Sequence, residues 1–147
     1  MIADDAGFND PSFVSSSGSL VEGLVNRSSF APGKPGSLSA LINDLYKKKN
    51  NVDLDDASAR AMQGMLVLAD AINRAGSTDA AKIQAALRAT DLKANQVVTG
   101  YNGVKFDDKG QNILASSLIT QMQGGSYVPV WPKDKAAGEL KLPYKGW

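Results

Sequence analysis

Two adjacent carboxylates near the start of the chain, Asp4 and Asp5, have the residue type and position to bind a ligand. They follow a short apolar segment and precede a glycine-containing turn, and open α/β sheets bind ligands where strands end. One interpretation is a carboxylate that accepts hydrogen bonds from a ligand ammonium or amide. The other is a turn-forming pair that caps a helix, which position alone favours. An acid/base pair is not expected, because neighbouring residues of a strand point to opposite faces.

Other polar clusters have structural interpretations. Asp55 and Asp56 lack the spacing and closing glutamate of a calcium loop, and helix capping explains them. Residues 107–110 fail the same test and predict a tight turn. Gly33 and Lys34 lack the frame of a phosphate-binding loop. No metal site and no cofactor are therefore expected.

The residue types that are absent narrow the function classes further. The 147 residues include neither Cys nor His, which excludes thiolate and imidazole chemistry and the usual zinc sites. An enzyme would have to use carboxylates, Lys or Tyr, so catalysis is not expected. The formal net charge is +1 and the lysines are scattered or lie at helix ends, so nucleic acid is not an expected partner.

The longest helical pattern covers residues 55–76 and is expected to organise the fold. Acidic residues suit its start, and Gly76 is the type of residue that commonly ends a helix. Its polar side chains form one narrow stripe, interrupted only by Val67: Arg60, Gln63, Asp70 and Arg74. Since most of the circumference is apolar, this helix is expected to be packed on several sides.

Shorter elements are expected around this helix. Helical patterns cover residues 11–16, 38–49 and 79–89, and Ser37 and Thr78 are the expected caps of the last two. A strand is expected over residues 20–28, and the Pro- and Gly-rich residues 30–36 predict a linker or crossover.

After Asp91 the apolar period changes from that of a helix to that of a strand. Strands are expected at residues 97–98 and 104–106, on either side of a turn. Residues 114–123 and 127–131 flank a Gly-Gly-Ser sequence and predict a β-hairpin.

Several motifs occur in an order that resembles one family: IADDAGFNDPSF, EGLV, SARAMQGMLVLADAINRAGSTDAAKIQAALRAT, GVKFDDKGQN and QGGSYVPVWP. The family is the type I periplasmic binding proteins, the solute receptors of ABC transporters in the branched-chain amino-acid class. The chain resembles only the C-terminal part of a complete receptor. The resemblance implies an α/β, periplasmic-binding-protein-like I fold that is incomplete, with helices and strands contributed to both lobes.

The family's chain path implies a division into three segments. Residues 1–32 would end the sheet of the second lobe, residues 33–113 would return to the first lobe as helices, and residues 114–147 would cross back. The start of the chain lacks the basic and apolar regions of a signal peptide. A periplasmic location is therefore implied by the resemblance alone.

The resemblance also implies a set of ligand-binding residues. Asp4 matches the acidic position that receives the α-ammonium of the ligand, and Phe8, in the same loop, is expected to line the cleft. Met62, flanked by Arg60, stands where the family often has an aromatic residue that closes over the ligand side chain. This departure favours a different or larger solute than a branched-chain amino acid.

The sequence thus predicts the solute-binding component of an ABC-type importer for amino acids or related small solutes, present as a C-terminal fragment. In the full-length protein it would act with an ABC permease. Alternatives are a ligand-sensing domain of a receptor or regulator with the same fold, and an interaction module without a small ligand.

The fragment is expected to leave the central helix without its usual partners. It should therefore pack in a compact arrangement unlike the parent's, or pair with another copy as a homo-oligomer or domain swap. Alone, it is expected to bind amino acids weakly or not at all.

Overall fold

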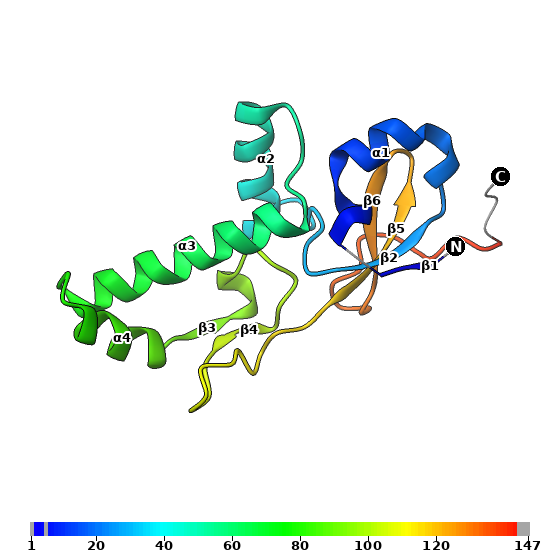
Figure 1. Cartoon of the computed structure of the whole chain (residues 1–147). Helices are drawn as coiled ribbons and strands as arrows, with labels where there is room; N and C mark the ends of the chain where they lie inside the picture. Colours follow the sequence, from blue (N-terminus) through cyan, green and yellow to red (C-terminus); the bar gives the residue numbers. More distant parts are fainter. Residues whose placement is uncertain (1, 5, 144–147) are drawn as a thin grey trace.

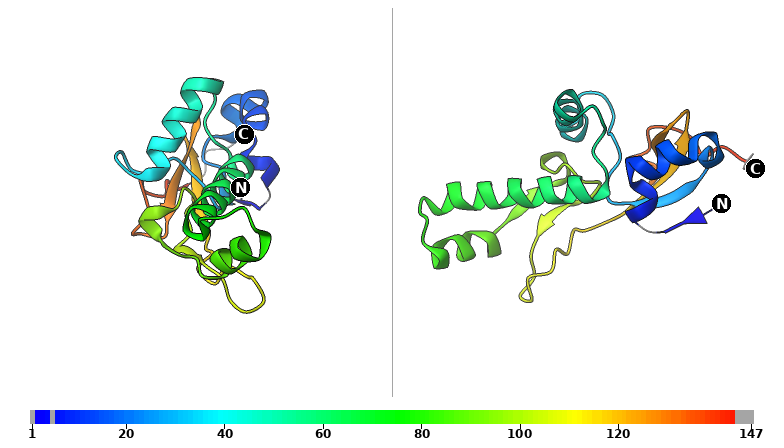
Figure 2. Two further views of the ribbon diagram at one scale, coloured as in Figure 1. Left: turned by 90° about the vertical axis from the view of Figure 1, so that its left-hand side faces the viewer. Right: turned by 45° about the horizontal axis from the view of Figure 1, so that its top comes forward.

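Two groups of elements lie side by side in the computed structural model, which describes residues 2–4 and 6–143 (Figure 1). The sheet part consists of β1 (Ile2–Ala3), α1 (Pro11–Ser17), β2 (Val25–Ser28), β5 (Leu118–Gln123) and β6 (Ser126–Trp131). The helical part consists of α2 (Leu38–Asn50), α3 (Asp56–Ala75), α4 (Ala80–Arg88), β3 (Asp91–Lys93) and β4 (Gly103–Lys105). Helices α3 and α4 extend away from the four-stranded sheet (Figure 2). The three-segment division predicted above stays a prediction.

The four strands of the sheet part lie in the order β1-β2-β5-β6. Their bounds are Ile2–Ala3, Val25–Ser28, Leu118–Gln123 and Ser126–Trp131. Strand β1 is parallel to β2, and the other neighbours are antiparallel. Gly124 and Gly125 have φ angles of 62° and 82°, as a two-residue hairpin turn requires. The predicted hairpin is confirmed, although its first strand begins later than expected.

Helix α1 (Pro11–Ser17) covers the sheet and confirms the helix predicted there. Asp10 caps it by accepting a hydrogen bond of 2.7 Å from the N–H of Ser12. The strand expected over residues 20–28 is shorter than predicted, because Gly18–Val21 forms a 3₁₀ turn. The core between helix and sheet contains Ala3, Val21, Leu24 and Met122, against which Phe8, Phe13, Val14 and Tyr127 pack.

Helix α2 (Leu38–Asn50) begins at its predicted cap, Ser37, whose hydroxyl accepts from the N–H of Ala40. Helix α4 (Ala80–Arg88) instead begins after Asp79, which accepts a 3.0 Å hydrogen bond from the N–H of Lys82. The prediction that Thr78 caps this helix was wrong. A carboxylate one residue closer to the helix fills that role.

Two short strands, β3 (Asp91–Lys93) and β4 (Gly103–Lys105), form a separate antiparallel pair. The prediction of a strand at residues 97–98 was wrong. These two valines are buried beneath α3, where the N–H of Val98 donates to the side-chain oxygen of Gln63 at 2.6 Å. The N–H of Val98 is therefore paired with a side-chain oxygen of α3 instead of with a neighbouring strand.

Helix α3 (Asp56–Ala75) begins and ends as predicted, with Asp55 as its N-cap and Gly76 in the left-handed conformation. Its inner face consists of Asp56, Ala59, Gln63, Val67 and Ala71, all buried. Its outer face consists of Met65, Leu66, Leu68 and Ile72, all exposed. The expectation that α3 is packed on several sides was wrong, because no other described element covers the outer face.

Candidate functional site

A polar cavity of about 380 Å³ opens where the sheet part meets the helical part. Its walls come from the end of β1, from β2, from the first turn of α3, and from two connecting segments. The lining residues are Asp4, Arg27, Ser28, Ser29, Asp56, Arg60, Tyr101, Ala115, Ser116 and Ser117. The cavity therefore collects charged and hydroxyl groups from segments that are distant in the sequence.

The parallel pairing of β1 and β2 places Asp4 beside Arg27. Ala3 is the register partner of Asn26, so the next residue of each strand follows side by side. The Nε of Arg27 donates to Oδ1 of Asp4 at 2.6 Å, and both side chains are more than half exposed. Because an exposed ion pair is worth only about 0–1 kcal/mol, this pair can open at little cost.

Asp56 joins the start of α3 to the end of β2. Its Oδ1 accepts hydrogen bonds from the N–H and hydroxyl of Ser29, both at 2.5 Å, and from the Ser28 hydroxyl at 3.1 Å. Burial raises the pKa of the Asp56 carboxyl, but these hydrogen bonds and the charge of Arg60 outweigh burial and hold the pKa below its ordinary value of 3.8. Asp56 is thus an ionised anchor between the two parts.

Arg60 is held on the cavity wall by Asp56. One η nitrogen lies 2.7 Å from Oδ2 of Asp56, and Nε donates to the Asp56 carbonyl oxygen at 3.3 Å. Both contacts go to one residue, four positions earlier on the same helix. The guanidinium is therefore fixed in orientation while its side chain remains about half exposed.

The connecting segments between the two parts are bonded to one another. The N–H of Gly100 donates to the carbonyl of Ser29 at 2.7 Å, and the Ser116 hydroxyl donates to the carbonyl of Gly100 at 2.9 Å. The ammonium of Lys135 donates to the same carbonyl and to the side chain of Asn102. Burial lowers the pKa of Lys135, while nearby Asp134 raises it. These hydrogen bonds hold in place the connecting segments that line the polar cavity.

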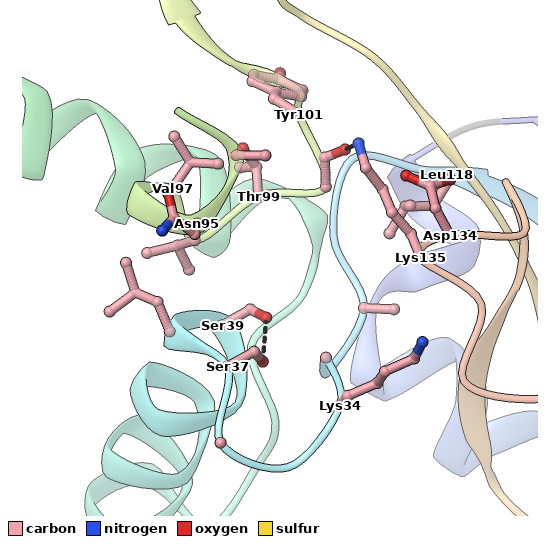
Figure 3. Close-up of a pocket in the computed structure, with 17 residues that line it drawn as sticks. Lys34, Ser37, Ser39, Asn95, Val97, Thr99, Tyr101, Leu118, Asp134 and Lys135 are labelled. Atoms are coloured by element: carbon pink, nitrogen blue, oxygen red, sulfur yellow. Dashed lines mark hydrogen bonds between the residues drawn. The ribbon is translucent and has the colours of Figure 1, made fainter. Parts of the chain in front are cut away.

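A second cavity, of about 600 Å³, is bounded by the start of α2, residues 94–101, Lys34 and Lys135 (Figure 3). The hydroxyls of Ser37 and Ser39, which line it, lie 3.0 Å apart and are hydrogen-bonded to each other. Lys135 already donates to the three oxygens of Gly100, Asn102 and Ser116. This cavity contains none of the predicted ligand-binding residues, and the polar cavity is therefore the candidate site.

The structure places two of the four predicted ligand-binding residues in the polar cavity, Asp4 and Arg60. Phe8 instead packs edge-on against Phe13, with the ring centroids 5.3 Å apart. Met62 packs against the buried cluster of Phe30, Leu54, Ala59 and Val98. Neither lines the polar cavity, and the ligand-binding role of all four stays a prediction.

Sequence reasoning missed Arg27 and the role of Asp56. Arg27 is the one exposed residue of β2, between buried Asn26 and Ser28. Alternation along residues 25–28 could have indicated this, but only the strand pairing places Arg27 beside Asp4. Helix capping explained Asp55 and not Asp56, whose carboxylate bonds another segment.

Comparison with known proteins identifies the fold. No family model matches the chain. Over 86% of its length the chain superposes on 35% of LivK, a leucine-binding protein of Thermotoga maritima MSB8, with a TM-score of 0.64 and 28% identity. It also superposes on 34% of LivJ of Streptococcus pneumoniae, solved with isoleucine, with a TM-score of 0.68 and 21% identity. The chain is a partial type I periplasmic binding protein.

Two named relatives agree with this assignment. The chain is 35% identical over 115 residues to Leu/Ile/Val-binding protein homolog 7 of Brucella abortus (strain 2308), a match that covers 78% of this chain and 28% of the relative. It is 31% identical over 79 residues to homolog 8 of the same strain. The chain therefore spans less than a third of the length of these relatives, which are named for solute binding and not for catalysis.

The superpositions correct one expectation. The prediction that the chain packs in a compact arrangement unlike that of a complete receptor was wrong, because 86% of the chain follows the fold of such receptors.

Within the described residues, no helix is long and apolar enough to cross a membrane.

Proposed function

We propose that this chain is part of the solute-binding component of an ABC importer for amino acids or related small solutes. It would contribute one wall of the binding site, and the remaining wall would come from the receptor portion outside the match. The periplasmic location, the ABC permease as partner and the three-segment division belong to the same proposal.

One observation carries this proposal: a polar cavity lined by the exposed Asp4–Arg27 pair, in a chain that follows the receptor fold. The two charges complement the ammonium and carboxylate of a zwitterion. Asp4 lies directly after β1, and an exposed carboxylate there can accept hydrogen bonds from an ammonium group. Binding needs no covalent step, since receptors of this kind close around the solute.

A chimera tests the proposal. The part of Thermotoga maritima LivK that this chain matches is replaced by this chain, and thermal unfolding is followed with each of the twenty amino acids. At least one amino acid should raise the midpoint temperature, because a ligand that binds the folded state stabilises it.

Asp4→Asn in the chimera should weaken that binding by about tenfold, the factor that corresponds to loss of one charge-assisted contact. Asp108→Asn, the same change at an exposed turn outside the cavity, should leave it unaltered. A chimera that unfolds cooperatively but responds to no amino acid would contradict the proposed function.

A further inference from the structure

We infer that the solute carries a carboxylate on its side group, so that this cavity selects an acidic amino acid over a branched aliphatic one. The inference rests on the proposed function and adds the chemical class of the solute. It is carried by the two guanidinium groups of the polar cavity, those of Arg27 and Arg60, and by the near absence of apolar lining.

The walls of the polar cavity do not suit an aliphatic side chain. Among the described lining residues, Ala115 is the single residue with an aliphatic side chain, and Tyr101 is the single aromatic. The others offer charges and serine hydroxyls. A leucine side chain placed here would displace water from polar groups without apolar contact in return, which is unfavourable.

The Asp4–Arg27 pair suits the part that all amino acids share. The contact described for Arg27 uses its Nε, and its two η nitrogens have no partner among the described residues. A guanidinium with free η N–H groups can bind a carboxylate through two parallel hydrogen bonds. The α-ammonium and α-carboxylate of an amino acid can thus engage Asp4 and Arg27 together.

Arg60 is the second cation of the polar cavity, and its contacts hold it in an orientation that suits an anionic group. Asp56 holds its Nε and one η nitrogen, and Asp56 itself is fixed by Ser28 and Ser29. The remaining N–H groups of Arg60 need no reorientation before a ligand binds, which lowers the entropic cost of binding. A carboxylate on the side group of the solute can accept hydrogen bonds from these N–H groups.

The same contacts disfavour a basic solute. In the Asp56 carboxylate, Oδ1 already accepts three hydrogen bonds from Ser28 and Ser29, and Oδ2 is paired with Arg60, so this group is less available to a second ammonium group.

The experiment uses the 147-residue chain and two probes of nearly equal shape, glutamate and glutamine. Amide chemical shifts are followed by ¹⁵N NMR as each probe is added, since an incomplete site is expected to bind weakly. The shifts should concentrate on Ser28, Ser29, Ser116 and Ser117, and glutamate should bind about fivefold more tightly than glutamine. Added salt should reduce this ratio, because salt screens the Arg60 charge.

Two matched variants locate the effect. Arg60→Gln should bring the ratio between the probes close to one, while Arg88→Gln, the same change on the exposed surface of α4, should leave it at about fivefold. Arg27→Gln should weaken both probes alike, because both carry the α-carboxylate.

Equal binding of glutamate and glutamine by the unmodified chain would overturn the inference, as would the absence of shifts at the cavity with both probes. Either result leaves the proposed function to be decided by the chimera, which responds to any amino acid. A chimera that binds leucine and not glutamate would refute the acidic solute and retain the receptor.

Discussion

Both the sheet part and the helical part bury apolar side chains, but the helical part leaves one apolar face of its longest helix exposed. In the sheet part the core side chains Leu24 and Met122 are 0% and 1% exposed. In the helical part α3 buries Gln63, at 4% exposure, and leaves Met65 63% exposed. The helical part has packing partners for the inner face of α3, in the clusters around Val98 and Val104, but among the described residues none for its outer face.

The polar stripe of α3 explains this difference. Gln63 belongs to that stripe and Val67 interrupts it, and both lie on the buried inner face. The uninterrupted apolar side of the helix faces outward. A surface helix normally turns its apolar stripe toward the core and its polar side toward solvent. No described element covers the outer face of α3, and the chain matches only 35% of LivK, so we expect this face to be a packing surface.

The largest effect should come from one change made in both parts. Leu24→Ala removes a fully buried side chain and should lower the free energy of unfolding by about 2–5 kcal/mol. Leu68→Ala, on the outer face, should lower it by less than about 1 kcal/mol. Urea unfolding measures both. An equal loss for the two variants would remove the contrast between the parts.

A second change tests whether the inner side of the helical part is as tightly packed as the sheet. Gly103 has a φ of 145°, and a Cβ there would lie 2.2 Å from the carbonyl oxygen of Leu92. Gly103→Ala should cost about 3 kcal/mol, since backbone must move. Gly76→Ala, where nothing lies within 4 Å, should cost about 1 kcal/mol. Similar losses would show that β3 and β4 are loosely paired.

A smaller effect is expected at the anchor between the parts. Asp56→Asn should lower stability at neutral pH by about 1–3 kcal/mol, because it weakens the acceptor for Ser29 and Arg60. The folded-state pKa of Asp56 is depressed, so its contribution is present above the unfolded value of 3.8 and is lost as pH falls through the lower folded value.

Urea unfolding repeated from pH 6 downwards, in steps of about half a unit, measures this pH dependence. The unmodified chain should lose more stability below pH 3.8 than Asp56→Asn does. Parallel curves for the two proteins would show that Asp56 keeps an ordinary pKa in the folded chain.

Local patterns predicted most of the helices and the hairpin correctly. Ser37, Asp55 and Gly76 determine helix ends through bonds within a few residues, and the Gly124-Gly125 turn is equally local. Such interactions can be read from neighbouring residue types.

The wrong strand at residues 97–98 and the omission of Arg27 came from contacts between distant segments, whereas the wrong cap at Thr78 was a local error. Val98 donates to Gln63 instead of a strand, and Arg27 reaches the site only because β1 pairs with β2. Hydrophobic periodicity also cannot reveal which face of α3 finds partners in this chain. The sequence correctly predicted how apolar α3 is, but only the structure shows which face of the helix is buried.

Light scattering coupled to size-exclusion chromatography tests the outer face of α3 most directly. Over a tenfold range of concentration, the average mass of the unmodified chain should rise above that of one chain, because an uncovered apolar face favours association. Leu68→Lys should restore the mass of one chain at every concentration. A constant mass of one chain for the unmodified protein would contradict the assignment of this face as a packing surface.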